Sequence, residues 1–323
     1  MNHLVWRLHR NQAYFALAAL AGLAVILLVT GITMADDYRN ALASCATQSC
    51  GILPTSSLFR GDGAIMDLVN ATIAVPLLFG LFWGAPLLAR EFEVGTNTLA
   101  WTQGVTRRRW LAGTIGWALA AAALWGAAVT ALVSWWRLPE NAVGVPYSGF
   151  DTGTFDIQGI VPVAYSVFAV ALGIAAGTVF RRLLPAMAVT FAVFVGLRFV
   201  IAEYLRPHYM TPVSRLIPLL GFSAGTGVPA GAWAMPGNDS VIGPNGQNHG
   251  NAIQVGFMPA ACRSDLSNGH AIACLAVRGF HTQVIYQPAN RFWAFQGIEA
   301  GIFIVLAAAL IALAWRLVLT RDA

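Results

Sequence analysis

Six long apolar stretches run along the chain, separated by polar or glycine-rich segments. A helix that crosses a bilayer needs about 20 mainly apolar residues, because the hydrocarbon layer offers the backbone no other hydrogen-bond partners. The stretches that reach this length are residues 13–33, 66–89, 111–134, 158–180, 185–204 and 292–315. The pattern predicts an all-α integral membrane protein: one transmembrane domain over residues 1–323, with six helices and a large loop at 205–291.

Two shorter features refine this plan. Only residues 181–184 separate the fourth and fifth spans, which predicts a tight helical hairpin. Within residues 4–10, apolar side chains can face one side of a short helix while two arginines face the other. Such a segment is typical of a helix lying in the headgroup layer, although a frayed basic N-terminus explains it equally well.

The charged residues exclude several classes of protein. Only 10% of the 323 residues are charged, and all nineteen basic residues are arginine. A chain without lysine has no Walker A phosphate loop and no Schiff-base lysine, so any ATP must be bound by another chain. The arginines flank the apolar runs instead of forming a dense patch, which argues against nucleic-acid binding.

The distribution of arginines predicts the orientation of the spans. With the N-terminus inside, ten arginines fall in cytoplasmic segments, whereas eight, including Arg206, fall in the outer loops. The cytoplasmic segments total about 45 residues and the outer ones about 143, so the density follows the positive-inside rule. Both termini are therefore expected in the cytoplasm. Nine acidic residues, Asp156 among them, lie outside or at the outer rim on this assignment.

All four cysteines fall in predicted outer loops, where an oxidising environment favours disulfides. Proximity in the sequence favours Cys45 with Cys50 and Cys262 with Cys274. Three pairings remain possible, as do free thiols. Neither pair has the two-residue spacing of a zinc knuckle, so no metal site is predicted.

The segment 90–110 between the second and third spans contains two helix stops and two helix starts. Gly95 can end an extension of the second span, because glycine adopts the left-handed cap conformation without steric cost. Thr96 or Asn97 can then cap a short helix that carries Leu99 and Trp101 and ends at Gly104, and Thr106 can cap the third span. Because a short helix buries little by itself, the two apolar side chains predict a partner surface.

This segment resembles the first cytoplasmic loop of type-2 ABC transporter permeases, particularly actinobacterial ones. The resemblance rests on Glu91-Phe92-Glu93-Val94-Gly95-Thr96, Leu99-Ala100-Trp101-Thr102-Gln103 and Arg108-Arg109-Trp110-Leu111, together with the six-span plan. It implies that this loop holds a coupling helix that docks against a separate ATPase. The residues to which the resemblance gives that role are Glu91, Glu93, Gly95, Thr96, Leu99, Trp101, Arg107 and Arg108.

The resemblance also implies the biochemical role of the chain. It implies a permease domain in the cell membrane that exports its substrate and is not itself an enzyme. The aromatic side chains of spans two and five favour a hydrophobic or amphipathic cargo. ATP and magnesium would bind in partner ABC ATPase subunits, and this chain would hold no cofactor. The translocation path would form between two permease chains, as a homodimer or a heterodimer, because one six-helix bundle leaves little room for a channel.

Three features inside the spans are candidates for packing or transport. The spacings Gly80 to Gly84 and Gly173 to Gly177 allow close helix contact and are candidates for a subunit interface. The similar depths of Arg198 and Glu299 predict an intramembrane ion pair that fixes packing or acts in gating, with Glu203 nearer the surface. Candidate substrate-facing aromatics on spans two and five are Phe79, Phe82, Trp83, Phe191, Phe194 and Phe199.

Two other functions compete with transport. A membrane scaffold or immunity protein could bind a ligand through the 205–291 loop without transporting it. A serine hydrolase is suggested by the Gly-x-Ser-x-Gly pattern around Ser223. The glycines and proline of residues 225–231 oppose the helix that such a nucleophile requires on its C-terminal side.

Overall fold

The structure is a computed structural model, and its described part forms two compact units. The described residues are 2–47, 63–95, 106–139, 149–150, 152–219, 228–229, 231–235, 240–250, 258–262 and 268–321. The helical unit comprises Met1–Val143, Thr152–Arg206 and Ala294–Ala323. The sheet unit comprises Gly144–Asp151 and Pro207–Trp293.

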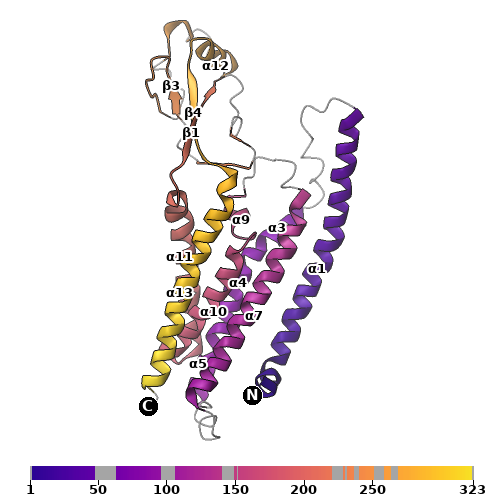
Figure 1. Cartoon of the computed structure of the whole chain (residues 1–323), viewed down its shortest axis with the longest axis vertical. Helices are drawn as coiled ribbons and strands as arrows, with labels where there is room; N and C mark the ends of the chain where they lie inside the picture. The colour runs from indigo at the N-terminus through magenta and orange to yellow at the C-terminus, as the bar shows by residue number, and fades with distance from the viewer. Residues whose placement is uncertain are drawn as a thin grey trace. The chain divides into compact units, whose positions relative to one another are not determined.

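Among the described residues, six helical segments are long and apolar enough to cross a membrane, which confirms the six predicted spans (Figure 1). They are Ala16–Asn40, Gly63–Val94, Arg107–Trp136, Val161–Phe180, Leu183–His208 and Ala289–Thr320. The first belongs to a single helix, α1 (Asn2–Thr47), so the N-terminal segment continues directly into the first span. The fourth span begins at Val161, three residues later than predicted, because the preceding residues form a turn.

The second span is divided into five short elements. They are α3 (Gly63–Ala71), η1 (Thr72–Ala74), α4 (Val75–Phe79), η2 (Gly80–Gly84) and α5 (Ala85–Val94). The remaining elements of the helical unit are α7 (Arg107–Trp136), α9 (Thr152–Phe155), α10 (Val161–Phe180), α11 (Leu183–Val200) with η3 (Ile201–Leu205), the first residue of η4 (Arg206–His208), and the greater part of α13 (Phe292–Arg321). The η2 element is a π-helical turn, a local widening of the helix that is frequent at functional sites.

The core of the helical unit is α10, in which sixteen of twenty residues are buried. It packs against α7, α11 and the second span. Gly173 makes the closest approach: a Cβ at this position would lie 2.5 Å from the Gly80 carbonyl oxygen and 2.5 Å from the Ala85 nitrogen. The two predicted small-residue spacings therefore pack against each other within one chain, which confirms the close helix contact.

The helix ends follow the local sequence. Gly95 ends α5 in the left-handed conformation with a φ of 76°, and the Thr106 side chain accepts a hydrogen bond from Arg109 N at the start of α7. Arg181 ends α10 with a φ of 53°, and α11 begins at Leu183. These observations confirm the predicted caps and the tight hairpin.

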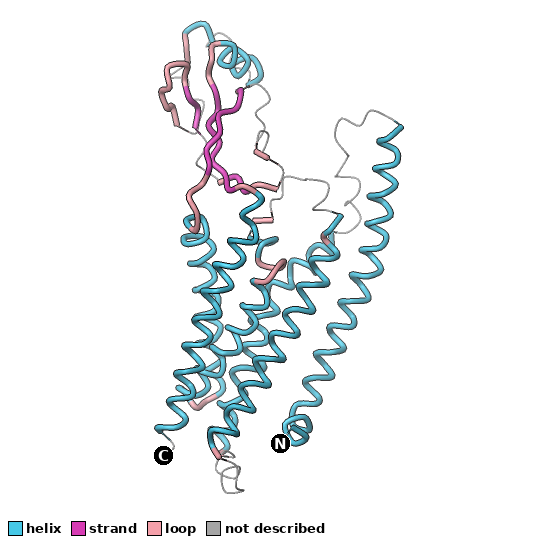
Figure 2. Tube along the Cα trace, viewed as in Figure 1, coloured by secondary structure: helices cyan, strands magenta, loops and turns pink. Residues whose placement is uncertain are grey.

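The sheet unit contains a structure that the all-helical prediction lacked (Figure 2). Its strands are β1 (Val213–Pro218), β2 (Trp233–Ala234), β3 (Ser240–Ile242) and β4 (His281–Gln287). The other three pair antiparallel with β4. A disulfide joins Cys262 to Cys274 of α12 (Asn268–Val277), with the two Cα atoms 5.6 Å apart. Both cysteines pack with Leu219, Val241 and Leu275 in the small core of this unit.

Candidate functional site

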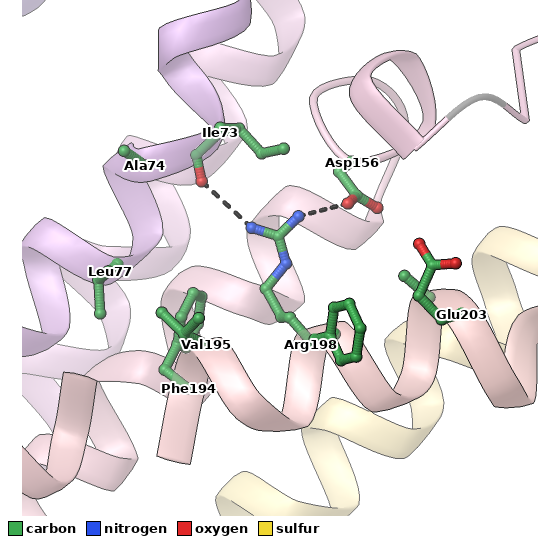
Figure 3. Close-up of a pocket in the computed structure, with 10 residues that line it drawn as sticks. Ile73, Ala74, Leu77, Asp156, Phe194, Val195, Arg198 and Glu203 are labelled. Atoms are coloured by element: carbon green, nitrogen blue, oxygen red, sulfur yellow. Dashed lines mark hydrogen bonds and ion pairs between the residues drawn. The ribbon is translucent and has the colours of Figure 1, made fainter. Parts of the chain in front are cut away.

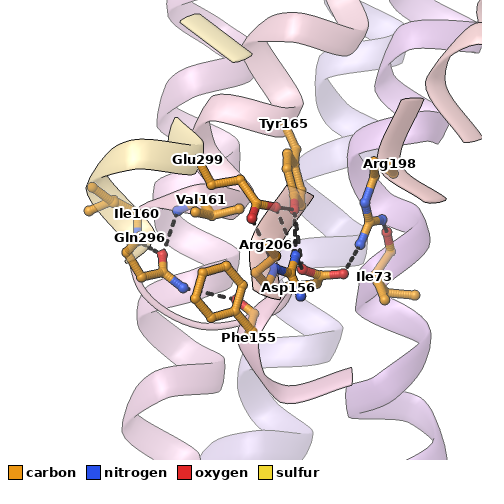
Figure 4. A network of polar contacts seen from close by, with 10 residues as sticks. All are labelled: Ile73, Phe155, Asp156, Ile160, Val161, Tyr165, Arg198, Arg206, Gln296 and Glu299. Carbon is orange, nitrogen blue, oxygen red and sulfur yellow. Dashed lines mark hydrogen bonds and ion pairs between the residues drawn. The ribbon is translucent and has the colours of Figure 1, made fainter. Parts of the chain in front are cut away.

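A buried polar network links four elements of the helical unit (Figure 4). Arg206 donates to Glu299 through Nε at 2.9 Å and Nη2 at 2.8 Å, and Nη2 also lies 2.5 Å from Asp156 Oδ1. The Tyr165 hydroxyl contacts the carboxylates of Glu299 and Asp156, the latter at 3.1 Å. Arg198 donates to the other Asp156 oxygen, Oδ2. Two guanidinium groups thus face two carboxylates, which balances the charge.

Burial makes this balance important. The side chains of Asp156, Arg206 and Glu299 are at most 1% exposed, and that of Arg198 is 14% exposed. Moving an ion out of water costs several kcal/mol, so such a cluster is stable only when each charge has a partner. The flat faces of the guanidinium groups are also covered, because Arg206 lies 4.1 Å above the Phe155 ring and Arg198 lies 4.5 Å above the Tyr165 ring.

Gln296 of α13 holds the turn that carries Asp156 against the start of α10 through three hydrogen bonds. The Gln296 side-chain oxygen accepts hydrogen bonds from the backbone N–H groups of Ile160 at 3.0 Å and Val161 at 2.9 Å. Its amide nitrogen donates to the Phe155 carbonyl at 3.0 Å. Gln296 lies almost one turn before Glu299 on α13, so this helix both caps α10 and supplies the network's second carboxylate.

The structure corrects the predicted ion pair. Arg198 pairs with Asp156 and donates to the Ile73 carbonyl at 3.3 Å, whereas Glu299 pairs with Arg206. The direct pair of Arg198 with Glu299 is therefore wrong. The prediction compared depths along two spans and assigned Asp156 and Arg206 to the outer side. Both residues are instead buried, since the chain folds back into the bundle before α10 and α11 continues helically through η3.

A pocket of about 330 Å³ lies beside Arg198, between the second span and α11 (Figure 3). Its walls are mainly apolar, and three charged residues also line it. The lining residues are Ile73, Ala74, Leu77, Asp156, Phe194, Val195, Arg198, Phe199, Ala202 and Glu203. Two of the six candidate substrate-facing aromatics, Phe194 and Phe199, are thus on the pocket wall.

The other four candidate aromatics lie elsewhere. Phe79 and Trp83 stack on each other with ring centroids 5.6 Å apart and pack against the buried residues of α5, α7 and α10. Phe82 and Phe191 are more than half exposed on the surface of the helical unit, where a bilayer or another chain could cover them. These positions are those of packing and surface residues, separate from the pocket.

The first residues of the predicted coupling segment, at the end of α5, contact the α10–α11 hairpin. Glu93, near the end of α5, accepts a hydrogen bond from the Leu183 backbone N–H at 3.2 Å, and Arg181 lies 5.1 Å above the Phe92 ring. Glu91 and Gly95 belong to the same end of the second span, and Arg107 and Arg108 begin α7. Thr96, Leu99 and Trp101 lie outside the described residues.

The contacts of Glu93 and Phe92 with the hairpin and the polar network lie at opposite ends of α10. Tyr165 and Arg181 are sixteen residues apart, which corresponds to about 24 Å along a helix. The carboxylate of Glu93 lies at the N-terminus of α11, where a negative charge is favourable and an unpaired N–H requires an acceptor. The end of α5 is thus hydrogen-bonded to the first turn of α11, whose last turn carries Arg198.

A family model described as "ABC-2 membrane transporter related" matches residues 17–206, more than half of the chain. The chain belongs to the ABC-2 membrane transporter related family. Membership supports a multi-pass transmembrane subunit of an ABC transporter, and this family implies partnership with ABC ATPase subunits. The comparisons with curated proteins and with solved structures found no match.

The family match divides the network. Asp156, Tyr165, Arg198 and Arg206 lie inside the matched range, whereas Glu299 and the Pro207–Trp293 segment of the sheet unit lie beyond it. The match ends at Arg206, which is also the last residue of that segment of the helical unit. The α13 carboxylate therefore completes a network whose other charged members belong to the ABC-2 membrane transporter related region.

Four residues of the polar network and its surroundings were not predicted as site residues. Tyr165 and Gln296 were not named, and Asp156 and Arg206 were counted only among the charges of the outer side. A search for further charged residues near the ends of the spans could have found these two. Cys50 and Ser223 lie outside the described residues, and the side chain of Cys45 is not described. The pairing of Cys45 with Cys50 and the hydrolase hypothesis therefore stay predictions.

Proposed function

We propose that this chain is the membrane subunit of an ATP-driven exporter in the cell membrane, with a hydrophobic or amphipathic cargo. ATP and magnesium bind to separate ABC ATPase subunits that dock on residues 91–110 from the cytoplasm. Two permease chains, identical or different, enclose the translocation path. The observation that carries the proposal is the hydrogen bond between Glu93 and Leu183, because it joins the docking segment to the α10–α11 hairpin.

Coupling follows from this connection. When ATP draws the two ATPases together, the docked segment moves with them and displaces the end of α5. Glu93 and the contact between Arg181 and Phe92 transmit the displacement to the start of α11. Because α10 is buried along its length, the helices that surround it are expected to shift as packed bodies, which changes the populations of inward- and outward-open states.

The packing of α10 also supports a path between two chains. A helix with sixteen buried residues at the centre of the bundle fills the space that a channel within one chain would need. The exposed apolar side chains of α11, such as Phe191 and Val195, offer a surface that can line a shared path.

Purification of the tagged chain in mild detergent tests the proposal. An ABC ATPase is expected to accompany the wild type and to hydrolyse ATP, and to be lost from the Glu91→Ala/Trp101→Ala variant. Asp67→Asn is the control, because Asp67 is exposed on α3 at the other end of the same span. If no ATPase accompanies the wild type under conditions that preserve membrane complexes, the exporter proposal is wrong, and the sheet unit should be tested for ligand binding.

A further inference from the structure

The pocket beside Arg198 is lined by apolar side chains of the second span and of α11, and one of its three charged residues, Glu203, has no ion-pair partner among the described residues. Ile73 and Leu77 of the second span line it, as do Phe194 and Phe199 of α11. Its volume of about 330 Å³ is at the lower end of the range for small-molecule sites. The pocket therefore suits a compact ligand with substantial apolar surface.

The charges around the pocket favour a cation. Arg198 is neutralised by Asp156, which belongs to the balanced network with Arg206 and Glu299. Glu203 also lines the pocket and is exposed, and within the part of the chain that the structure describes its carboxylate makes no ion pair or hydrogen bond. Figure 3 shows its carboxylate with no contact drawn to the other lining residues. The remaining charge on the pocket wall is therefore negative.

The position of Glu203 fits a ligand that enters from the membrane surface. Glu203 lies twenty residues after the start of α11, about 30 Å along the helix, which places it close to one edge of the hydrocarbon layer. The exposed ring of Phe199, one turn earlier, adds an aromatic face of the kind that attracts organic cations.

We infer that this pocket binds a cationic amphipathic molecule, with its apolar groups between Leu77, Phe194 and Phe199 and its positive charge at Glu203. The inference rests on the proposed function in one respect: the bound molecule is identified as the transported substrate. An anionic ligand is disfavoured because the arginine on the wall already has a carboxylate partner. A neutral ligand would leave the Glu203 carboxylate without a counter-charge.

A matched pair of ions tests the inference. Tetraphenylphosphonium and tetraphenylborate have nearly the same size and shape and opposite charges. Saturable binding of each ion is measured by equilibrium dialysis on the purified chain in uncharged lipid nanodiscs, with empty nanodiscs as the partition control. Saturable binding of the phosphonium, and none of the borate, is expected for the wild type.

Three variants locate the site. Glu203→Gln is expected to weaken phosphonium binding about tenfold or more, the loss expected when a charged partner is removed. Leu77→Trp, which fills the pocket, is expected to abolish it. Asp67→Asn removes an exposed carboxylate from the second span away from the pocket and should leave binding unchanged. Thermal melting of each variant verifies that it is folded.

The results separate this inference from the proposed function. Equal binding of the two ions, or unchanged phosphonium binding in Glu203→Gln, would overturn the inference. Because the assay contains neither ATP nor an ATPase, absence of a copurifying ATPase would refute the exporter without altering the binding result.

Discussion

Replacing Glu299 by glutamine perturbs the most buried carboxylate of the network without changing its shape. Glu299 is 0% exposed and accepts from Arg206 through both oxygens, at 2.9 Å and 2.8 Å. A glutamine presents one oxygen and one NH₂ group. Whichever way the amide is turned, one Arg206 N–H loses its acceptor and faces another donor. The cluster also changes from balanced charge to a net charge of one positive unit inside the bundle.

The expected cost is large. Removing one partner of a buried ion pair costs about 3–5 kcal/mol, because the other charge stays buried without compensation. For a domain of about 200 residues, each kcal/mol lowers the melting temperature by about 2–4 °C. A fall of about 10 °C in the apparent melting temperature is therefore expected for Glu299→Gln, measured by intrinsic fluorescence in mild detergent.

Two further variants identify the cause. Glu203→Gln is the matched control, because the same chemical change at an exposed and unpaired carboxylate should alter stability by about 0.5 kcal/mol or less. Glu299→Gln/Arg206→Gln removes both charges and leaves Asp156 paired with Arg198, so it should be more stable than the sum of the two single losses predicts. A melting temperature of Glu299→Gln equal to that of the wild type would show that the buried charge balance does not stabilise the protein. Strict additivity in the double variant would show that Glu299 and Arg206 are not coupled.

Two other predictions concern packing and the sheet unit. Gly173→Ala should destabilise the protein by about 1–3 kcal/mol, because its Cβ would meet the backbone of Gly80 and Ala85 at 2.5 Å. Gly116→Ala on α7 is the control and should not destabilise the protein, because a Cβ there meets open space. Equal melting temperatures for the two variants would contradict the close packing. Cys262→Ser should destabilise the sheet unit by about 3 kcal/mol, since the disulfide closes a short loop. Faster limited proteolysis of that unit than in the wild type is the measurement, and an unchanged cleavage rate would contradict it.

The features that the sequence predicted are those fixed by neighbouring residues. The apolar runs define the spans because each stretch satisfies the bilayer requirement by itself. Gly95 and Thr106 have the predicted cap geometry for the same reason, since a cap depends on residues within one turn. The small-residue spacing around Gly173 predicted a close contact, although it did not identify the second span as the partner.

The polar network was not predictable in the same way. Asp156 and Arg206 are fifty residues apart in the sequence, and Arg206 and Glu299 are ninety-three apart. Their pairing depends on how the turn before α10 and the π-helical end of α11 fold back into the bundle. A count of charges along the chain assigns such residues to loops, because position along a span does not report tertiary burial.

The sheet was missed although β4 carries a visible signal. Thr282, Val284 and Tyr286 alternate with more exposed residues and are buried, the period-two pattern of a half-buried strand. The strand is only seven residues long, and its partner β1 lies more than sixty residues earlier. Short segments of this kind become recognisable only when paired.

The proposed transmission of the ATPase movement from Glu93 to α11 is tested by the distance between spin labels at Leu78→Cys and Val195→Cys, two exposed positions on α4 and α11. The complex with its ATPase is compared before and after trapping with ATP, magnesium and vanadate, and the unsubstituted chain gives the background from native cysteines. A shift of the distance distribution is expected in the wild type and in Val94→Ala, and its loss is expected in Glu93→Ala while the ATPase stays bound. No shift in the wild type, or an undiminished shift in Glu93→Ala, would contradict it.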